Sequence, residues 1–498
     1  MSNVLEFRKF APPPEEEMRI IHSPFNPADV HSTDPLSAEV LVQASGFKSR
    51  FPVYRISPLG VELDCRSISG EDCSEMIKAG SQIDLRMQIG KHQSEFNGLV
   101  VATKHHEAER DLFGVRWCQV VEPRNVDVER RKLTRWLCGD EFLPTGIAPN
   151  PTRFNDYVYF KVHDISKEGM QISTSLRNKF LIRGMVLEAM ASFPMVGQVQ
   201  VNLKILNARI RSVDGRELLS LGTEVVDPDR RVLETIGQYL LQFGSNTTAI
   251  DLKREGLPVR SVATALDFSF VKTAEDYNDV LRLRKLAYSA GEKIDPNTRI
   301  EEMGDIFDSR ARIVMARHMG KSVGSLRLMF HDPEDLMEHE QFTTLPNDFP
   351  RKDELVEVTR VCTDPAYRGS DLFYALMKQM ILAIAQSKRR WLVGSATVNL
   401  WPLYRKMGFH STGIKYCHEH IGNEEHEIFL GDVPKMISGV GVGPALWNEL
   451  YADVSDYLRD LHGFEFDPMM NVRMATYRAL KPFTFLFSAG IRKPGKIN

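Results

Sequence analysis

The chain has 498 residues, of which 43% are hydrophobic and 26% are charged, and its formal net charge at pH 7 is -3. This composition is typical of folded soluble protein, and the length allows about three domains of roughly 150 residues each. The near-neutral charge gives no overall field that would favour DNA, RNA or a membrane. The sequence has no run of about 18 apolar residues that would predict a membrane-spanning helix, and no signal-peptide core.

The six cysteines form no CxxC pair, which argues against a zinc ribbon, a redox pair or a disulfide framework. We therefore expect a cytoplasmic protein that uses no metal. Residues 1–35 are polar, with three prolines followed by three glutamates, and are expected to be a disordered leader.

From residue 36 to residue 123 the pattern is typical of short β-strands. Ile83, Leu85, Met87 and Ile89 alternate with polar residues, so one face of this strand is expected to be buried. Similar short runs, separated by turn residues, occur throughout this range. The spacing predicts a small antiparallel β-barrel.

The same pattern recurs over residues 124–230. Residues 221–226 read like residues 112–117, and residues 166–169 read like residues 57–60. We interpret this as a weak internal duplication that gives two barrels in tandem.

The pattern changes after residue 230. Residues 231–262 are expected to form a helical linker, and residues 263–465 alternate strands with helices, which predicts an α/β domain. Thr273 and Asp276 can form a capping box. A last long helix is expected to carry Leu446, Leu450, Val454 and Leu461. Residues 466–498 form a basic tail with interleaved aromatic residues. This tail could contact anionic lipid at the inner membrane, or acyl carrier protein, and a disordered or packed tail is an equally open alternative.

One constellation of polar residues lies at the entrance to the second barrel. Arg131 and Arg135 are four residues apart, with Arg130 adjacent, and a turn follows that carries Asp164, Ser166 and Gly169. Arginine grips phosphate in a bidentate manner and stacks on purine faces. A carboxylate can accept hydrogen bonds from a base edge, a serine can donate to phosphate, and a glycine permits a tight turn.

This pairing of RxxxR with DxSxxG resembles the PilZ domain, a receptor for cyclic di-GMP. The resemblance implies that Arg130, Arg131, Arg135, Asp164, Ser166 and Gly169 bind the dinucleotide. A solvated charged turn followed by an ordinary hairpin is the competing interpretation. The first barrel has Arg55 where the carboxylate should be and no preceding RxxxR, so we expect a degenerate domain that packs or relays.

A second constellation runs from Leu355 to Gly369, where a predicted strand leads into a turn and a helix. Amides at a helix N-terminus bind anions. This turn, with Arg368, Gly369 and Ser370, resembles the phosphate-binding turn of the GNAT acyltransferases, which implies a site for a phosphopantetheine carrier. Residues 399–409 resemble a later helix of that superfamily, and Tyr404 could protonate a leaving thiolate. Asp371 departs from the glycine-rich pattern and would repel phosphate.

A closer resemblance covers about residues 265–465. Residues 324–328, Met337, Phe342 and residues 357–360 look like the acyl-homoserine-lactone synthases and the related N-acyl amino acid synthases. That resemblance implies transfer of a fatty acyl group from acyl carrier protein or coenzyme A to a small amine.

The candidate catalytic residues are acids and arginines that could hold an acceptor. Asp305, Asp308 and Glu357 could anchor an ammonium group and supply a general base. Arg327 and Arg360 could hold an acceptor carboxylate or orient Glu357. A structural ion-pair network is the alternative for this set. Cys362 is expected to be a buried strand cysteine. His418, His420 and His426 fit no strong zinc spacing.

Taken together, the sequence predicts two antiparallel β-barrels followed by an α/β GNAT-like acyltransferase domain, with cyclic di-GMP regulating transfer of an acyl group to an amine. The competing hypothesis is a non-enzymatic cyclic di-GMP effector in which the acyltransferase-like domain binds a protein or lipid. The departure at Asp371 favours the effector. The presence of Glu357 with Arg327 and Arg360 favours the enzyme.

Overall fold

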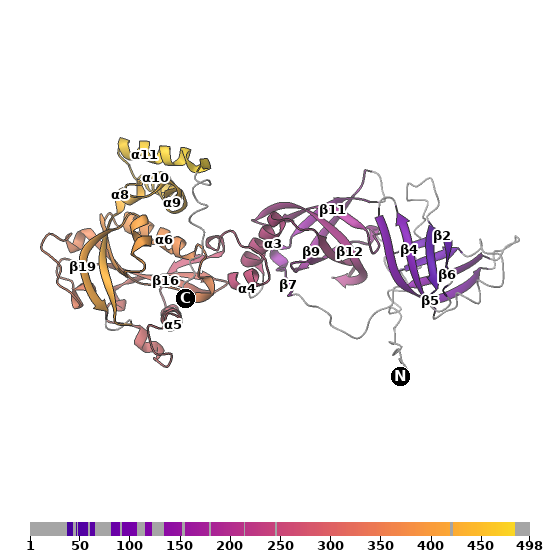
Figure 1. Cartoon of the computed structure of the whole chain (residues 1–498), viewed down its shortest axis with the longest axis horizontal. Helices are drawn as coiled ribbons and strands as arrows, with labels where there is room; N and C mark the ends of the chain where they lie inside the picture. The colour runs from indigo at the N-terminus through magenta and orange to yellow at the C-terminus, as the bar shows by residue number, and fades with distance from the viewer. Residues whose placement is uncertain are drawn as a thin grey trace. The chain divides into compact units, whose positions relative to one another are not determined.

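The computed structural model describes residues 37–42, 46, 48–57, 60–64, 81–89, 92–106, 115–121, 134–151, 155–178, 181–213, 215–244, 247–418 and 422–483. The chain forms two compact units (Figure 1). The first unit comprises residues 1–247 and 251–260, and the second comprises residues 248–250 and 261–498. The expected leader over residues 1–35 lies outside the described residues.

A closed barrel of six antiparallel strands begins the first unit, with the order β1-β2-β3-β6-β5-β4. Its strands are β1 (Ser37–Val42), β2 (Lys48–Ser57), β3 (Gly60–Asp64), β4 (Gln82–Ile89), β5 (His92–His106) and β6 (Val115–Val121). The alternation in β4 has the predicted consequence, because Ile83, Leu85 and Met87 are all buried.

The second barrel follows the same plan. Its strands are β7 (Trp136–Leu137), β8 (Thr145–Pro149), β9 (Tyr157–Ile165), β10 (Gly169–Ser175), β11 (Val186–Phe193), β12 (Gly197–Val213) and β13 (Arg216–Val226). The order is β10-β13-β12-β11-β8-β9-β7, and a further pairing of β9 with β10 closes the ring. Val158, Phe160 and Val162 point into its core.

The two barrels repeat each other in strand order and in the positions of their bulges. One extra residue lies at equivalent places in β2 and β9, at Tyr54 and His163 respectively. Another lies at equivalent places in β5 and β12, at Val101 and Leu206. Since a bulge fixes the register on both sides of it, these shared positions confirm the predicted duplication.

Helix α3 (Arg230–Phe243) packs on the second barrel, and α4 (Ala249–Arg254) follows it. Asp229 caps α3 by accepting a hydrogen bond from the backbone of Val232. The Tyr239 hydroxyl donates to the backbone oxygen of Phe142 over 2.9 Å. The segment expected to be a linker therefore begins with a helix that forms part of the core of the first unit.

A sheet of seven strands organises the second unit, with the order β14-β15-β16-β17-β18-β20-β19. The strands are β14 (Asp267–Phe270), β15 (Arg312–His318), β16 (Lys321–Phe330), β17 (Leu355–Thr363), β18 (Trp391–Thr397), β19 (His410–His418) and β20 (Glu424–Asp432). β17 and β18 run parallel, and every other neighbouring pair is antiparallel.

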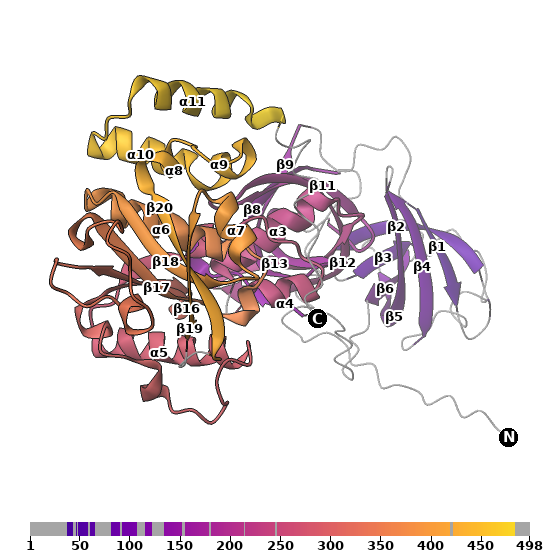
Figure 2. The same cartoon turned by 60° about the vertical axis from the view of Figure 1, so that its left-hand side comes forward.

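The two longest helices of this unit cover opposite faces of the sheet (Figure 2). The helices are α5 (Ala274–Ser289), α6 (Leu372–Gln386), α7 (Trp401–Lys406), α8 (Val433–Ile437), α9 (Pro444–Leu450), α10 (Ala452–His462) and α11 (Pro468–Ala479). The capping box of Thr273 and Asp276 at the start of α5 is confirmed. In the described part of the chain, no helix is long and apolar enough to cross a membrane.

Two differences from the predicted elements concern the end of the chain. The long helix expected over residues 446–461 is interrupted at Tyr451, a turn residue with a φ of -117° that separates α9 from α10. Part of the expected tail is α11. Asp467 caps it by accepting from the backbone of Met470, Pro468 occupies its first turn, and Met474 is fully buried.

The fold prediction of two barrels followed by an α/β domain is confirmed.

Candidate functional site

The edges of β17 and β18 separate part-way along the sheet. Their pairing begins at Leu355 with Trp391 and ends at Val358 with Gly394, although both strands continue. Beyond this point β17 has a bulge against β16, and Arg360 within it has a φ of 55°. Backbone groups of β17 that face the separation have no strand partner on β18, so they are available to a ligand.

A cavity of about 150 Å³ lies at this separation. The residues that line it come from both strands, from α5 and α6, and from the segments around them: Tyr288, Lys293, Glu338, Val358, Thr359, Arg360, Val361, Met377, Met380, Leu392, Ser395, Ala396, Thr397, Leu400, Tyr404, Phe409, Tyr416, His418, His426 and Phe429. Met377 and Met380 on α6 contribute an apolar wall, whereas Tyr288 comes from α5 on the opposite face. The cavity therefore offers an apolar wall and a polar wall where the sheet opens.

Tyr404 is the polar group on the apolar wall. Its ring stacks on Phe429 with centroids 4.7 Å apart, and its hydroxyl has no hydrogen-bond partner among the residues that the structure describes. Burial raises the pKa of Tyr404 to about 12. The hydroxyl therefore keeps its proton at neutral pH and can give it to a stronger base that arrives in the cavity.

Arg327 is at the centre of a buried ion network behind the polar wall. Its guanidinium is fully buried and pairs with Asp305, with Asp308 at 2.8 Å and with Glu338 at 2.5 Å. Arg284 binds Asp308 through two hydrogen bonds of 2.6 and 2.9 Å. Bidentate pairs of this kind fix side-chain direction as well as charge.

Arg360 carries this network into the cavity. Its Nη2 atom lies 2.8 Å from Asp305 and 3.3 Å from Glu338. Burial opposes the ionisation of Glu338, yet the neighbouring His418 and the charges of Arg360 and Arg327 hold its pKa well below the usual range. Glu338 is therefore an ionised carboxylate at the cavity wall, with His418 beside it at 3.8 Å.

Glu357 is not among the residues that line the cavity. It is completely buried, and its carboxylate accepts from His331 Nε2 at 2.8 Å, from His339 Nδ1, and from the backbone N–H groups of Glu338 and His339 at 3.1 and 3.0 Å. Burial opposes its ionisation, but the charge and hydrogen bonds of the two histidines lower its pKa to about 2. Glu357 therefore holds the segment that carries Glu338.

The turn before α6 contains Arg368, Gly369 and Ser370. Gly369 has a φ of 77°, which favours glycine because a side chain is strained there. Ser370 Oγ donates to the backbone oxygen of Tyr367 over 2.7 Å and lies 3.3 Å from the backbone nitrogen of Leu372. The turn therefore leads directly into the first amides of α6.

In the second barrel, Arg135 and Asp164 form an ion pair of 2.6 Å. The backbone N–H of Ser166 donates to Gly169 over 2.8 Å and closes the turn between β9 and β10. A Cβ atom at Gly169 would lie 2.4 Å from the backbone oxygen of Thr223 on β13. Glycine is required here because β13 approaches so closely, and not for a positive φ. Arg130 and Arg131 lie outside the described residues.

Residues 279–424 match the family model of the N-acyl amino acid synthase FeeM. The second unit therefore contains a region similar to an N-acyl amino acid synthase, which we call the synthase-like domain. A search of curated proteins found no match to the chain.

Solved structures that match include three of interest. FeeM, an N-acyl amino acid synthase from uncultured soil microbes, is 14% identical over 35% of this chain and 93% of its own, with a TM-score of 0.28. An acyl-CoA N-acyltransferase from Pseudomonas aeruginosa is 21% identical over 33% and 99%, with a TM-score of 0.25. The K. pneumonia MrkH–c-di-GMP complex is 16% identical over 45% and 90%, with a TM-score of 0.22.

The structure brings together most of the residues that the sequence singled out in the synthase-like domain. Asp305, Asp308 and Arg327 form one network, Arg360 joins it to the cavity, and Tyr404 lines the cavity from another side. Sequence reasoning missed Glu338, although it lies between the quoted Met337 and Phe342. It expected His418 and His426 to be exposed histidines of a strand and loop rather than metal ligands, but His418 is buried.

Burial and the charge of His418 lower the pKa of His426 to about 4, so this imidazole is neutral at pH 7. Among the described side chains, no group of three or more His, Cys, Asp and Glu residues is placed to hold a metal ion. His420 lies outside the described residues. Cys362 is buried in β17, as expected.

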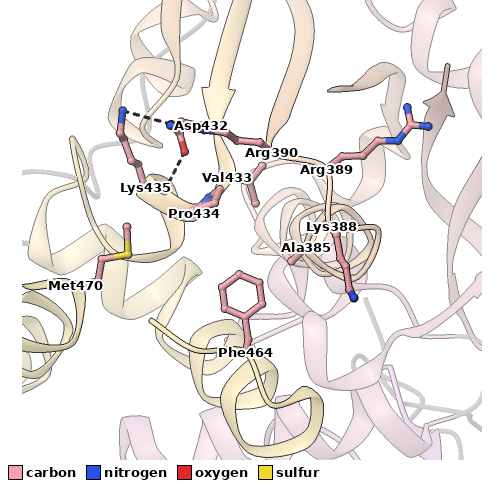
Figure 3. Close-up of a pocket in the computed structure, with 10 residues that line it drawn as sticks. All are labelled: Ala385, Lys388, Arg389, Arg390, Asp432, Val433, Pro434, Lys435, Phe464 and Met470. Atoms are coloured by element: carbon pink, nitrogen blue, oxygen red, sulfur yellow. Dashed lines mark hydrogen bonds and ion pairs between the residues drawn. The ribbon is translucent and has the colours of Figure 1, made fainter. Parts of the chain in front are cut away.

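A larger cavity, of about 360 Å³, lies elsewhere in the second unit (Figure 3). Several cations line it, but those around Asp432 already have partners: Arg390 lies 2.8 Å and Lys435 3.3 Å from its carboxylate. Arg389 donates to the backbone oxygens of His331 and Leu355. These pairs stabilise the junction of β20 with α8, so we regard this cavity as structural.

Proposed function

We propose that the synthase-like domain is an N-acyltransferase that moves an acyl group from a thioester to an amine. The observation that carries this proposal is the cavity where β17 and β18 separate. It is lined by ionised Glu338 and by the hydroxyl of Tyr404, which makes no hydrogen bond within the described part of the chain. A thioester can enter such an opening from the sheet edge, and an amine can meet it there. The match to the FeeM family model over residues 279–424 supports the same reaction class.

The side chains of this cavity can supply each proton transfer. The acceptor ammonium loses one proton to His418, which lies 3.8 Å from the carboxylate of Glu338, and this proton passes to water. The free amine attacks the thioester carbonyl and forms the C–N bond, while an N–H group of the unpaired part of β17 binds the carbonyl oxygen. The C–S bond then breaks, Tyr404 gives its proton to sulfur, and the second nitrogen proton restores Tyr404.

The acceptor that we propose follows from the charges on the polar wall, and the donor follows from the turn at the start of α6. Arg360 can bind a carboxylate and Glu338 an ammonium group, so a small amino acid fits this wall. The amides at the start of α6, together with Arg368, Gly369 and Ser370, would receive the phosphopantetheine of acyl carrier protein or coenzyme A. In this proposal Arg360 and Glu338 are positioned by Asp305, Asp308 and Arg327. Glu357 does not reach the cavity and positions the segment that carries Glu338.

The test is to incubate the full chain with acyl carrier protein and coenzyme A thioesters of several chain lengths and a mixture of amino acids. Mass spectrometry would detect the amide. We expect an amide with at least one donor. If no donor gives a product, with or without cyclic di-GMP, the enzyme proposal fails and the alternative of a non-enzymatic effector takes its place.

We also propose that the second barrel binds cyclic di-GMP. The observation that favours it is the Arg135–Asp164 pair at the turn closed by Ser166 and Gly169. A guanidinium that reaches this carboxylate is within reach of a phosphate placed beside the turn. Calorimetry on Arg131→Ala, Arg135→Ala and Asp164→Ala tests it. We expect each variant to bind at least about tenfold more weakly, and affinity unchanged in all three would remove the proposal.

A further inference from the structure

Asp371, which departs from the glycine-rich pattern of the phosphate turn, has a structural partner. It immediately precedes α6 and follows Ser370. Its carboxylate accepts from Ser261 Oγ at 2.6 Å, from the Val262 backbone at 2.7 Å and from the Ala263 backbone at 3.3 Å. An aspartate in this position commonly caps its own helix, but the side chain of Asp371 makes no such bond. Its hydrogen-bonding capacity is used to hold a segment about 110 residues earlier.

The residue before that segment, Arg260, makes its hydrogen bonds within the first unit. The backbone N–H of Arg260 donates to Gln238 over 3.1 Å, and its guanidinium donates to Glu234 over 3.2 Å. Both acceptors are on α3 of the first unit. Arg260 is the last residue of the first unit and Ser261 begins the main part of the second. The consecutive residues Arg260 and Ser261 therefore make these hydrogen bonds within different units, Arg260 in the first and Ser261 in the second.

Helix α3 in turn contacts the segment that carries Arg135. Tyr239 donates to the backbone of Phe142, and the rings of Phe142 and Phe243 stack with centroids 4.7 Å apart. A β-bridge joins Cys138 to Gly244 at the end of the helix. Arg135 lies only three residues before this bridge. The segment that follows Arg135 is therefore joined to the last two turns of α3 by a hydrogen bond, a β-bridge and packed rings.

We propose that the hydrogen bonds of Asp371 couple the two binding sites. Through them, cyclic di-GMP bound to the second barrel changes the affinity of the second unit for its acyl carrier. Arg135 has to share or release Asp164 when it binds a phosphate, and the Arg135 segment then moves against α3. Arg260 and Ser261 pass that movement to Asp371. Since Asp371 adjoins the turn formed by Arg368, Gly369 and Ser370, a change in its hydrogen bonds moves a negative charge at the place where a carrier phosphate would bind.

This inference rests on both proposed functions, and it makes Asp371 a positioning residue for the carrier site. It also accounts for an acidic residue in a turn that should bind phosphate: while three donors hold the carboxylate, its charge is directed away from the first amides of α6. Contiguous hydrogen bonds of this kind carry coupling free energies that change affinities by about 5- to 150-fold.

The experiment is a binding measurement that does not depend on catalysis. Calorimetry gives the affinity of the full chain for acyl carrier protein with and without saturating cyclic di-GMP. We expect the dinucleotide to change this affinity at least about fivefold in the parent protein. Asp371→Ala should reduce the effect to less than about twofold and leave the affinity for cyclic di-GMP alone unaltered. Ser261→Ala removes one of the three donors without touching the helix cap, so it should give an intermediate effect.

Asp453→Asn is the matched control, because Asp453 is an exposed acid of the same unit, with 64% of its side chain accessible. It should keep the full response. The inference is overturned if Asp371→Ala and Ser261→Ala both respond as the parent does, or if the dinucleotide binds without changing carrier affinity. A protein that shows the coupling and makes no amide would refute the enzyme proposal alone. Absence of dinucleotide binding would refute the receptor proposal and this inference together.

Discussion

The guanidinium of Arg327 and the carboxylate of Glu338 lie 2.5 Å apart, and both side chains are almost completely buried. Arg327 is on strand β16, whereas Glu338 is on the segment that leads away from it. This pair links the sheet to the wall of the cavity. Each partner has further opposite charges nearby, so the network satisfies the charge that it buries.

Arg327→Met is expected to destabilise the second unit by about 3–5 kcal/mol, since it removes the cation shared by the buried carboxylates of Asp308 and Glu338 and the half-buried one of Asp305. Urea unfolding monitored by circular dichroism would measure the loss. Arg282→Ala is the control, because that arginine is on the exposed side of α5 with 63% of its side chain accessible, and it should change stability by less than about 1 kcal/mol. Equal effects of the two variants would contradict the central position of Arg327.

Tyr404→Phe is expected to lower kcat by about 10²- to 10⁴-fold, because the thiolate would leave without a proton donor. KM for the donor and the unfolding midpoint should change little, since the hydroxyl makes no hydrogen bond to the residues that the structure describes. Steady-state kinetics with the best donor would measure this. Tyr457→Phe, at an exposed tyrosine of α10, should behave as the parent does. An unimpaired Tyr404→Phe enzyme would exclude this tyrosine as the acid.

The pair of Glu357 and His339 predicts how the stability of the second unit depends on pH. The folded pKa of Glu357 is about 2, below the ordinary 4.5, so its contribution is present above pH 4.5 and is lost as the pH falls towards 2. Burial opposes the protonation of His339, but Glu357 raises its pKa above 6.5. Its contribution is therefore present below pH 6.5 and is lost as the pH rises through the folded pKa.

Glu357→Gln should weaken the pH dependence of the unfolding free energy on both the acidic and the alkaline side, because each side depends on the same carboxylate. Unfolding free energies measured across this pH range would show the difference from the parent narrowing below pH 4.5 and again above pH 6.5. Glu354→Gln, at an exposed position three residues earlier, should retain the parent profile. A pH dependence that Glu357→Gln leaves intact would locate the titrating groups elsewhere.

Gly169→Ala is expected to destabilise the second barrel by about 1–3 kcal/mol, because the new methyl would lie 2.4 Å from the Thr223 backbone oxygen. Affinity for cyclic di-GMP should fall with it, since the turn and Ser166 move together. Thermal unfolding and calorimetry would measure the two effects. Gly139→Ala is the control: Gly139 has a φ of -66° and room for a methyl. A tolerated Gly169→Ala would show that β13 can yield.

The sequence predicted what depends on local pattern. Alternation in β4 placed Ile83 and Leu85 in a barrel core, and Thr273 with Asp276 located the start of α5. It could not place Glu357, because strand periodicity does not reveal that residues 331–341 fold back and enclose the carboxylate. For the same reason the sequence pattern did not predict that Glu338 and His418 line one cavity.

The two barrels of the first unit also show which parts of that architecture are free to vary. Register pairs Arg55 with Glu62 in the first barrel at the place where Asp164 faces Gln171 in the second. The bulge next to this position, at Tyr54 in the first barrel and at His163 in the second, is shared by the two barrels, whereas the charge at this position is opposite. Strand pairing therefore maintains the barrel without a contribution from that side chain. A duplicated barrel of this kind can gain or lose a recognition surface by a single substitution while its fold is retained.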